Sequence, residues 1–73
     1  MSAAPSGIRI TVNGVSSECP AGLSVEGLLR HLNLPAERVA VERNREIVLR
    51  DLRGAQEVRP DDVFEIVTFV GGG

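Results

Sequence analysis

The sequence contains no lysine, tryptophan or tyrosine, and only one cysteine and two phenylalanines among 73 residues. A single cysteine excludes an intramolecular disulfide, which is typical of proteins in a reducing compartment, and we expect a cytoplasmic protein. With 3% aromatic residues, Val, Leu and Ile must fill the core. The net charge is −2 and no Tyr or Trp can stack on bases, so we expect no nucleic-acid binding.

Long apolar runs are also missing. No stretch is long enough to span a membrane, and no basic segment followed by an apolar one marks a signal peptide. The first seven residues, MSAAPSG, are small and polar, and we interpret residues 1–7 as a disordered leader or an expression remnant. The remaining length suffices for one domain, which we place at residues 8–70, ahead of a glycine tail at residues 71–73.

The residues after the leader predict a β-hairpin. Residues 8–12 (IRITV) alternate apolar and polar side chains, as a half-buried strand does. Asn13-Gly14 follows, a pair typical of two-residue hairpin turns in which both positions have φ > 0. Residues 15–19 (VSSEC) alternate again and form the second strand, with Cys19 pointing inward.

One short helix is expected next. Ser24 can cap it, and Glu26 lies in the first turn, where the helix dipole favours an acid. Asn33 can adopt the left-handed conformation that ends a helix, and Pro35 prevents its continuation. Four apolar residues at helical spacing form a stripe that packs on a sheet: Val25, Leu28, Leu29 and Leu32.

The second half of the chain predicts three more strands, at residues 38–42, 46–50 and 63–70. Asn44-Arg45 must turn between the first two, although Arg45 is poorly suited to a turn that requires φ > 0. The last strand is apolar on both faces, which is typical of a strand in the middle of a sheet. The order β-β-α-β-β-β predicts an α+β domain, a mixed four- to five-stranded sheet with one helix packed on one face. This order resembles the ubiquitin-like β-grasp fold.

Conventional catalysis has little support in the sequence. Cys19 has no histidine nearby in sequence and is expected in the core, and His31 is the only histidine. Asp61-Asp62 directly precedes a strand and is interpreted as turn chemistry. No spacing of His, Cys or carboxylates predicts a metal site, and no phosphate-binding loop is present. We therefore expect a protein that is not an enzyme and binds no cofactor of its own.

Three glycines, Gly71 to Gly73, follow the last strand directly. An expression remnant and a frayed end are two explanations. A third is a working tail, because glycine has no Cβ and an extended glycine chain can enter a channel too narrow for any side chain. A terminal carboxylate on such a tail becomes reactive once a partner converts it to an anhydride with AMP. A GC-rich genome explains the use of arginine in place of lysine. The alternative is that a chain carrying an activated acyl group gains from having no lysine amine that could attack it.

Four stretches resemble the ThiS family of thiamine-biosynthesis sulfur carriers: ITVNG, PAGLSVEGLLRHLNL, ERVAVERNREIV and DDVFEIVTFVGGG. The resemblance implies that the carboxylate of Gly73 is adenylated and converted to a thiocarboxylate, with Gly71 and Gly72 threading the partner active sites. It implies two partners, a ThiF-type adenylyltransferase that uses ATP and a persulfide sulfur donor, and a ThiG-type thiazole synthase. Phe69 and Val70 are candidates for contact with a partner, and we expect a monomer when no partner is bound.

Other functions stay open from the residues alone. The small subunit of molybdopterin synthase ends similarly but tends to be longer, with proline before its glycines, and carriers of cysteine and siderophore pathways share the tail. From another class, a ubiquitin-like interaction module could bind partners through the surplus apolar residues of the last strand, residues 63–70.

Overall fold

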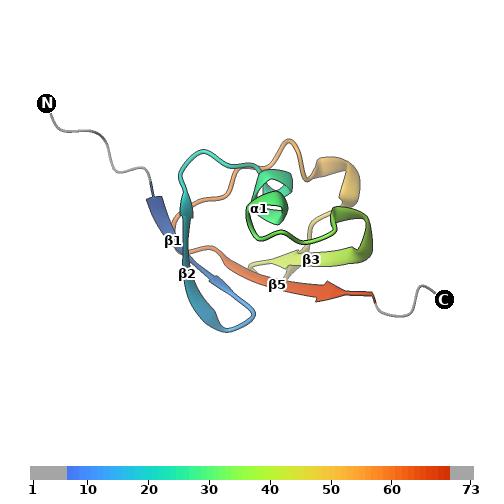
Figure 1. Cartoon of the computed structure of the whole chain (residues 1–73), viewed down its shortest axis with the longest axis horizontal. Coiled ribbons are helices and arrows are strands. Elements are labelled where there is room, and N and C mark those ends of the chain that lie inside the picture. Colours follow the sequence, from blue (N-terminus) through green and yellow to red (C-terminus); the bar gives the residue numbers. More distant parts are fainter. Residues whose placement is uncertain (1–6, 70–73) are drawn as a thin grey trace, which may run out of the picture.

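A computed structural model describes residues 7–69 of the chain (Figure 1). Its five strands are β1 (Gly7–Val12), β2 (Val15–Pro20), β3 (Val39–Arg43), β4 (Glu46–Ile47) and β5 (Val63–Thr68). Its helical elements are the α-helix α1 (Val25–His31) and two 3₁₀ turns, η1 (Ala36–Arg38) and η2 (Arg50–Leu52). Among the described residues, no helix is both long and apolar enough to cross a membrane.

The strands form one mixed sheet in the order β2-β1-β5-β3-β4. β1 pairs antiparallel with β2 and parallel with β5, and β3 pairs antiparallel with both β5 and β4. The last strand is therefore central and lies beside the first, while α1 lies across one face of the sheet (Figure 1). The predicted α+β fold with one helix on a mixed sheet is confirmed.

The helix begins and ends at the residues that the sequence indicates. The Ser24 hydroxyl accepts a hydrogen bond of 3.0 Å from the backbone N–H of Gly27, and Asn33 has φ 59° just beyond the C-cap. Val25, Leu28 and Leu29 are completely buried, whereas Leu32 packs at the edge of the core. The apolar stripe therefore faces the sheet, as predicted.

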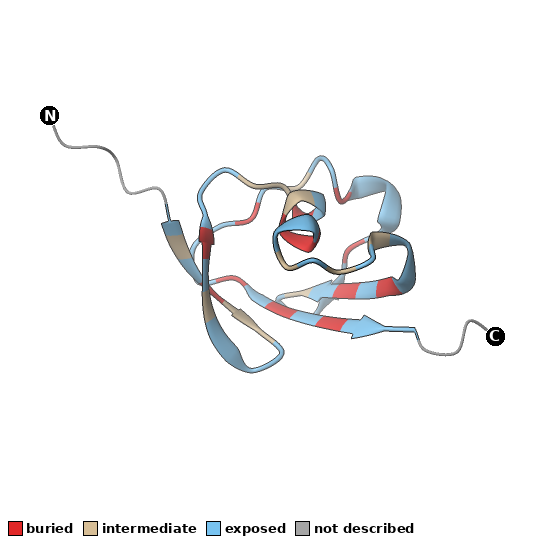
Figure 2. Cartoon of the chain, in the orientation of Figure 1, coloured by how far each residue is buried: buried red, intermediate tan, exposed pale blue. Residues whose placement is uncertain are grey.

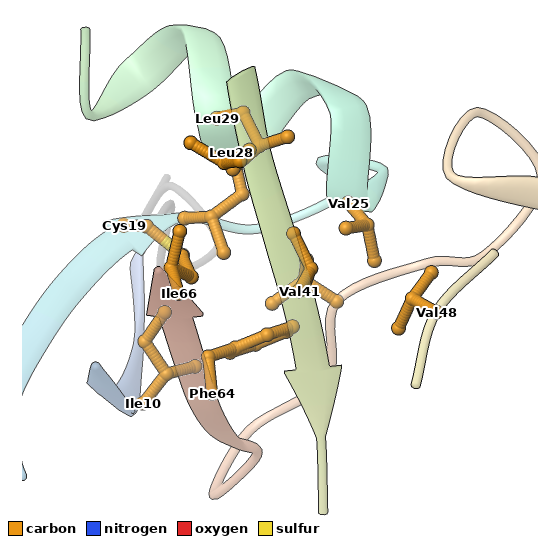
Figure 3. Close-up of a cluster of buried hydrophobic side chains, with 11 residues drawn as sticks. Ile10, Cys19, Val25, Leu28, Leu29, Val41, Val48, Phe64 and Ile66 are labelled. Atoms are coloured by element: carbon orange, nitrogen blue, oxygen red, sulfur yellow. The ribbon is translucent and has the colours of Figure 1, made fainter. Parts of the chain in front are cut away.

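The core lies between α1 and the sheet (Figure 3). β1, β2, β3 and β5 contribute residues from one face, so that β5 alternates buried and exposed positions along most of its length (Figure 2). Phe64, the one buried aromatic residue between residues 7 and 69, lies at the centre. The buried side chains of this core cluster are Ile10, Cys19, Val25, Leu28, Leu29, Val39, Val41, Val48, Val58, Phe64 and Ile66.

Several boundaries differ from the prediction. β1 begins at Gly7, within the expected leader, and residues 1–6 lie outside the described part. β3 runs one residue later than predicted, because Arg38 belongs to η1. The strand predicted at residues 46–50 ends at Ile47, after which Val48 turns into the core and the chain enters η2.

The turn between β3 and β4 has φ 52° at Asn44 and φ 72° at Arg45. Both values are positive, as in the turns that best match the twist of a hairpin. Arg45 thus adopts a conformation that the sequence argued against. Its side chain is exposed, so the cost of this conformation is the local strain between its Cβ and its own backbone.

Candidate functional site at the end of the central strand

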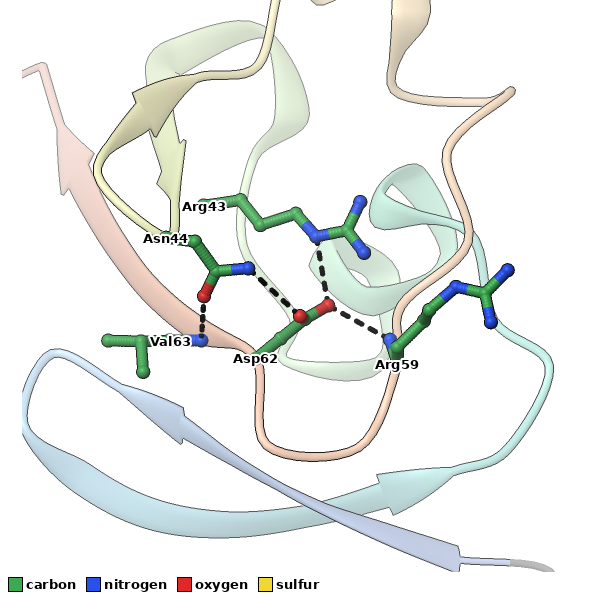
Figure 4. Close-up of polar contacts among 5 residues, drawn as sticks. All are labelled: Arg43, Asn44, Arg59, Asp62 and Val63. Atoms are coloured by element: carbon green, nitrogen blue, oxygen red, sulfur yellow. Dashed lines mark hydrogen bonds and ion pairs between the residues drawn. The ribbon is translucent and has the colours of Figure 1, made fainter.

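The start of β5 is held by a cluster of polar contacts around Asp62 (Figure 4). This buried carboxylate accepts hydrogen bonds of 2.9 Å from Arg43 Nε, 3.1 Å from Asn44 Nδ2 and 2.9 Å from the backbone N–H of Arg59. Asn44 Oδ1 accepts a bond of 2.9 Å from the N–H of Val63. The cluster joins the β3–β4 turn to the first residue of β5. A charged bond to a mostly buried guanidinium is among the stronger polar contacts in proteins.

The middle of β5 is held from the other side by Asn13, in the β1–β2 turn. Its Nδ2 donates to the carbonyl of Ile66 at 3.1 Å, and its Oδ1 accepts from the N–H of Ile66 at 2.7 Å. The backbone N–H of Asn13 also donates to the carbonyl of Phe64 at 2.9 Å. The side-chain amide thus takes the place of a peptide group and extends the parallel pairing of β1 and β5 beyond the end of β1.

The end of β5 is fixed by η1. The N–H of Phe69 donates to the carbonyl of Arg38 at 2.7 Å. Arg53 holds the same segment, because its guanidinium donates bonds of 2.8 Å to the carbonyls of Ala36 and Val39 on either side of Arg38. Burial, assisted by the positive charge of Arg50, lowers the pKa of Arg53 below its usual range. The end of β5 is therefore held in place by η1 and Arg53.

The predicted site residues follow this point. Phe69 is 54% exposed, and its contact with a partner stays a prediction. Val70 and the three tail glycines, Gly71, Gly72 and Gly73, lie outside the described residues. The structure thus gives the base of the predicted tail, a central strand tied at its start, middle and end.

Of the two side chains that sequence analysis did not expect to be catalytic, Cys19 lies in the core cluster. Cys19 is 3% exposed, and burial raises the pKa of its thiol above the usual value of 9.0, so the reactive thiolate is disfavoured. His31 is exposed in the last turn of α1. Within residues 7–69, no group of three or more His, Cys, Asp or Glu residues could hold a metal ion.

Sequence reasoning missed the contacts that position β5. It assigned Asp61-Asp62 to a turn, and Asp61 does have φ 71°, but Asp62 is buried and bonds across the sheet as well. It assigned Asn13 and Asn44 to hairpin turns, but not the bonds that their side chains make to β5. The only sequence signal for those bonds is that asparagine is the first residue of both turns.

Comparison with known proteins gives a consistent result. The sequence profile of the ThiS family matches residues 10–73. A crystal structure of the thiamine biosynthesis protein ThiS from Geobacter metallireducens superposes with a TM-score of 0.78 at 38% identity, covering 90% of this chain and all of that one. An uncharacterized protein, ycf40, from Porphyra purpurea is 36% identical over 90% of this chain and 93% of its own length.

Thiazole synthases are similar over a part of their length. That of Magnetococcus marinus is 44% identical and that of Paramagnetospirillum magneticum 39% identical, each over 66 residues. The chain spans 20% of the length of each of these two relatives. The family profile covers nearly all of the sequence, and the fold agrees with that of the solved ThiS structure. The chain therefore belongs to the ThiS family.

Proposed function

We propose that this chain is a sulfur carrier of thiamine biosynthesis, and that it carries the sulfur on the carboxylate of Gly73. The observation that supports this most directly is the position of β5. The central strand is held at Asp62, at Ile66 and at Phe69, and residues 71–73, all glycine, follow almost at once. A tail built this way has a fixed base and no side chain at its end, as entry into a narrow active site requires.

The proposed chemistry belongs to the partners. A ThiF-type adenylyltransferase binds ATP, the Gly73 carboxylate attacks the α-phosphorus, and pyrophosphate leaves. The outer sulfur of a persulfide then attacks the acyl carbon and releases AMP, which leaves an acyl disulfide. A thiol reduces the disulfide, so that the thiocarboxylate is freed while the two thiol sulfurs become joined. On a ThiG-type thiazole synthase the thiocarboxylate sulfur attacks an electrophilic carbon of that enzyme's substrate and forms a thioester. Water then cleaves the acyl C–S bond, which leaves the sulfur on the substrate and restores the Gly73 carboxylate.

In this scheme the chain is a co-substrate and not an enzyme, and it binds no cofactor. Because activation consumes ATP and the lone cysteine suits a reducing compartment, we place the reaction in the cytoplasm, with the free carrier as a monomer. The similarity to thiazole synthases and to a thiamine-biosynthesis ThiS supports the thiamine pathway over molybdopterin synthesis. An interaction module without sulfur chemistry is the second candidate, and the exposed apolar residues of β5 favour it.

Intact mass spectrometry tests the proposal. The protein isolated from its own cells should end at Gly73. After incubation with the cognate adenylyltransferase, ATP and a persulfide donor, its mass should rise by the replacement of one oxygen with sulfur. Removing Gly73 sets the carboxylate back by up to about 3.5 Å, and a misplacement of 1 Å can cost about a hundredfold in rate. The shortened chain should therefore not be loaded.

The Cys19→Ala variant is the control, because the sulfur is expected on the carbonyl and not on the buried thiol. It should be loaded at the rate of the unchanged chain. Loading of the chain that lacks Gly73, or loading that depends on Cys19, would overturn the carrier proposal and leave the interaction module.

A further inference from the structure

The face of the sheet opposite α1 is not covered by any described element (Figure 1). Three exposed apolar side chains lie on this open face of β5 and β4: Val63 is 44%, Val67 59% and Ile47 71% exposed. A shallow groove crosses the face between β5, β3 and β4, with Ala40, Val67 and Ile47 along it. Isolated exposed apolar residues are ordinary, but Ala40, Ile47 and Val67 line one groove, and grouped exposed apolar side chains indicate a binding surface.

Two glutamates lie at the centre of this apolar surface. Glu42 on β3 and Glu65 on β5 are directly opposite in the strand register, and both line the groove. Among the described residues neither carboxylate has an ion-pair partner, and Arg43, the cation next to Glu42 in the sequence, pairs with Asp62. Like charges directly opposite in a sheet are destabilising. The free protein therefore holds an unfavourable pair at the middle of an exposed apolar surface.

We infer that this surface, defined by Ala40, Glu42, Ile47, Glu65 and Val67, binds a partner protein that inserts an arginine or lysine between the two carboxylates, with apolar groups around it. Such a cation would turn the repulsion in the free chain into attraction in the complex. Arginine suits the position because its planar guanidinium can bond two carboxylates at once.

The charge of the two glutamates argues against three other binding partners: a second copy of this chain, nucleic acid and an anionic lipid surface. In a symmetric contact between two copies of this face, four carboxylates would meet across the interface. Nucleic acid and anionic lipid surfaces carry the same sign of charge as the two glutamates, so that contact with either would be repulsive.

The surface also continues toward the predicted tail. Val67 lies two residues before Phe69, the half-exposed last described residue, and both precede the glycines on the same segment. A protein bound on the open face would thus stand next to the point where the tail begins. We assign this surface to the adenylyltransferase, because that enzyme must receive the tail. This identification of the partner rests on the proposed function.

The test compares binding of the cognate adenylyltransferase by the unchanged chain and by the double variant Glu42→Gln, Glu65→Gln. Glutamine keeps the shape of both side chains and removes only the charges. Removing the charges of a buried pair weakens binding by at least about tenfold. We therefore expect the double variant to bind the adenylyltransferase at least about tenfold more weakly than the unchanged chain at low salt, and the difference in affinity to be smaller at high salt. The melting temperature of the free double variant should be equal or higher, since the repulsion is gone.

Glu57→Gln is the matched control. Glu57 is exposed, and its backbone forms an isolated antiparallel β-bridge with Ser24 at the start of α1. It therefore lies on the helix side of the sheet, away from the open face. It should bind as the unchanged chain does. A Val67→Ser variant should also weaken binding, since it removes apolar surface beside the glutamates.

Each result decides between the ideas. Equal affinity of the unchanged chain and the double variant for the adenylyltransferase overturns the inference, and so does a lower melting temperature of the double variant. If the unchanged chain is still loaded with sulfur in that case, the carrier proposal stands. Self-association of the unchanged chain that the double variant enhances overturns it in favour of a second copy. No binding of the unchanged chain to the adenylyltransferase overturns both the inference and the proposed function.

Discussion

Asp62 is the residue on which the start of β5 depends most directly. Its carboxylate is 8% exposed and holds three donors, one of them the Arg43 guanidinium, which is itself 19% exposed. Removing the carboxylate would leave a mostly buried cation and two other donors without their acceptor. Groups left in this way carry their full desolvation cost, and charged ones carry the most.

We therefore predict that Asp62→Ala lowers the free energy of unfolding by roughly 2–4 kcal/mol. Asp61→Asn is the control, because Asp61 is exposed with φ 71° and asparagine tolerates that conformation equally well. Its effect should stay within about 0.5 kcal/mol. Urea unfolding measures both changes. Similar effects of the two substitutions would show that the cluster around Asp62 contributes little.

The same residues mark a limit of sequence analysis. The turn at Asn13-Gly14 was predictable because it rests on local backbone preference, and Asn13 does have φ 51°. The bonds from its side chain reach Ile66, which is 53 residues away. Such bonds depend on the packed sheet and leave no periodic pattern in the sequence, so they could not be predicted.

Among the elements, α1 shows what a short amphipathic pattern can establish. The helix has seven residues, too few to be stable alone, so its formation depends on the stripe that it packs against the sheet. Leu28 and Leu29 are both 0% exposed and lie over the core strands (Figure 3). Truncating either side chain would open a cavity that the surrounding core residues cannot fully close.

Leu28→Ala and Leu29→Ala should each cost roughly 2–5 kcal/mol in the free energy of unfolding, a large part of the stability of so small a domain. Leu49→Ala removes the same atoms from a side chain that is 61% exposed, and it should change stability by less than about 1 kcal/mol. Circular dichroism during denaturant unfolding measures all three. A cost at Leu49 equal to that at Leu28 would contradict the assigned packing of the helix.

The strands were predicted with uneven success, for physical reasons. Alternation identified β1, because an apolar side chain is needed wherever the helix covers the sheet, and the apolar residues on both faces of the last strand predicted its central position. An apolar pattern on both faces of β5 did not imply burial on both faces, since Val67 is 59% exposed. The length of β4 was also beyond prediction, because Val48 leaves the strand to enter the core while it still bonds the carbonyl of Val41.

At the scale of the whole molecule, the fold and the proposed chemistry occupy different parts of the chain. Every member of the core cluster lies between Ile10 and Ile66. The backbone bond that fixes the end of β5 is made by Phe69. The contacts described above thus lie within residues 7–69, whereas the proposed sulfur chemistry takes place at Gly73.

We therefore predict that deleting residues 70–73 leaves the free energy of unfolding within about 0.5 kcal/mol of the full chain, as for substitutions outside a packed region. The same deletion should abolish sulfur loading by the adenylyltransferase. Denaturant unfolding and intact mass measure the two outcomes on one preparation. Because the open-face surface of β3, β4 and β5 is intact, the shortened chain should still bind the adenylyltransferase and compete with the full chain for it. A stability loss above about 1 kcal/mol would mean that residues 70–73 pack against the domain, and sulfur loading of the shortened chain would exclude Gly73 as the reacting group.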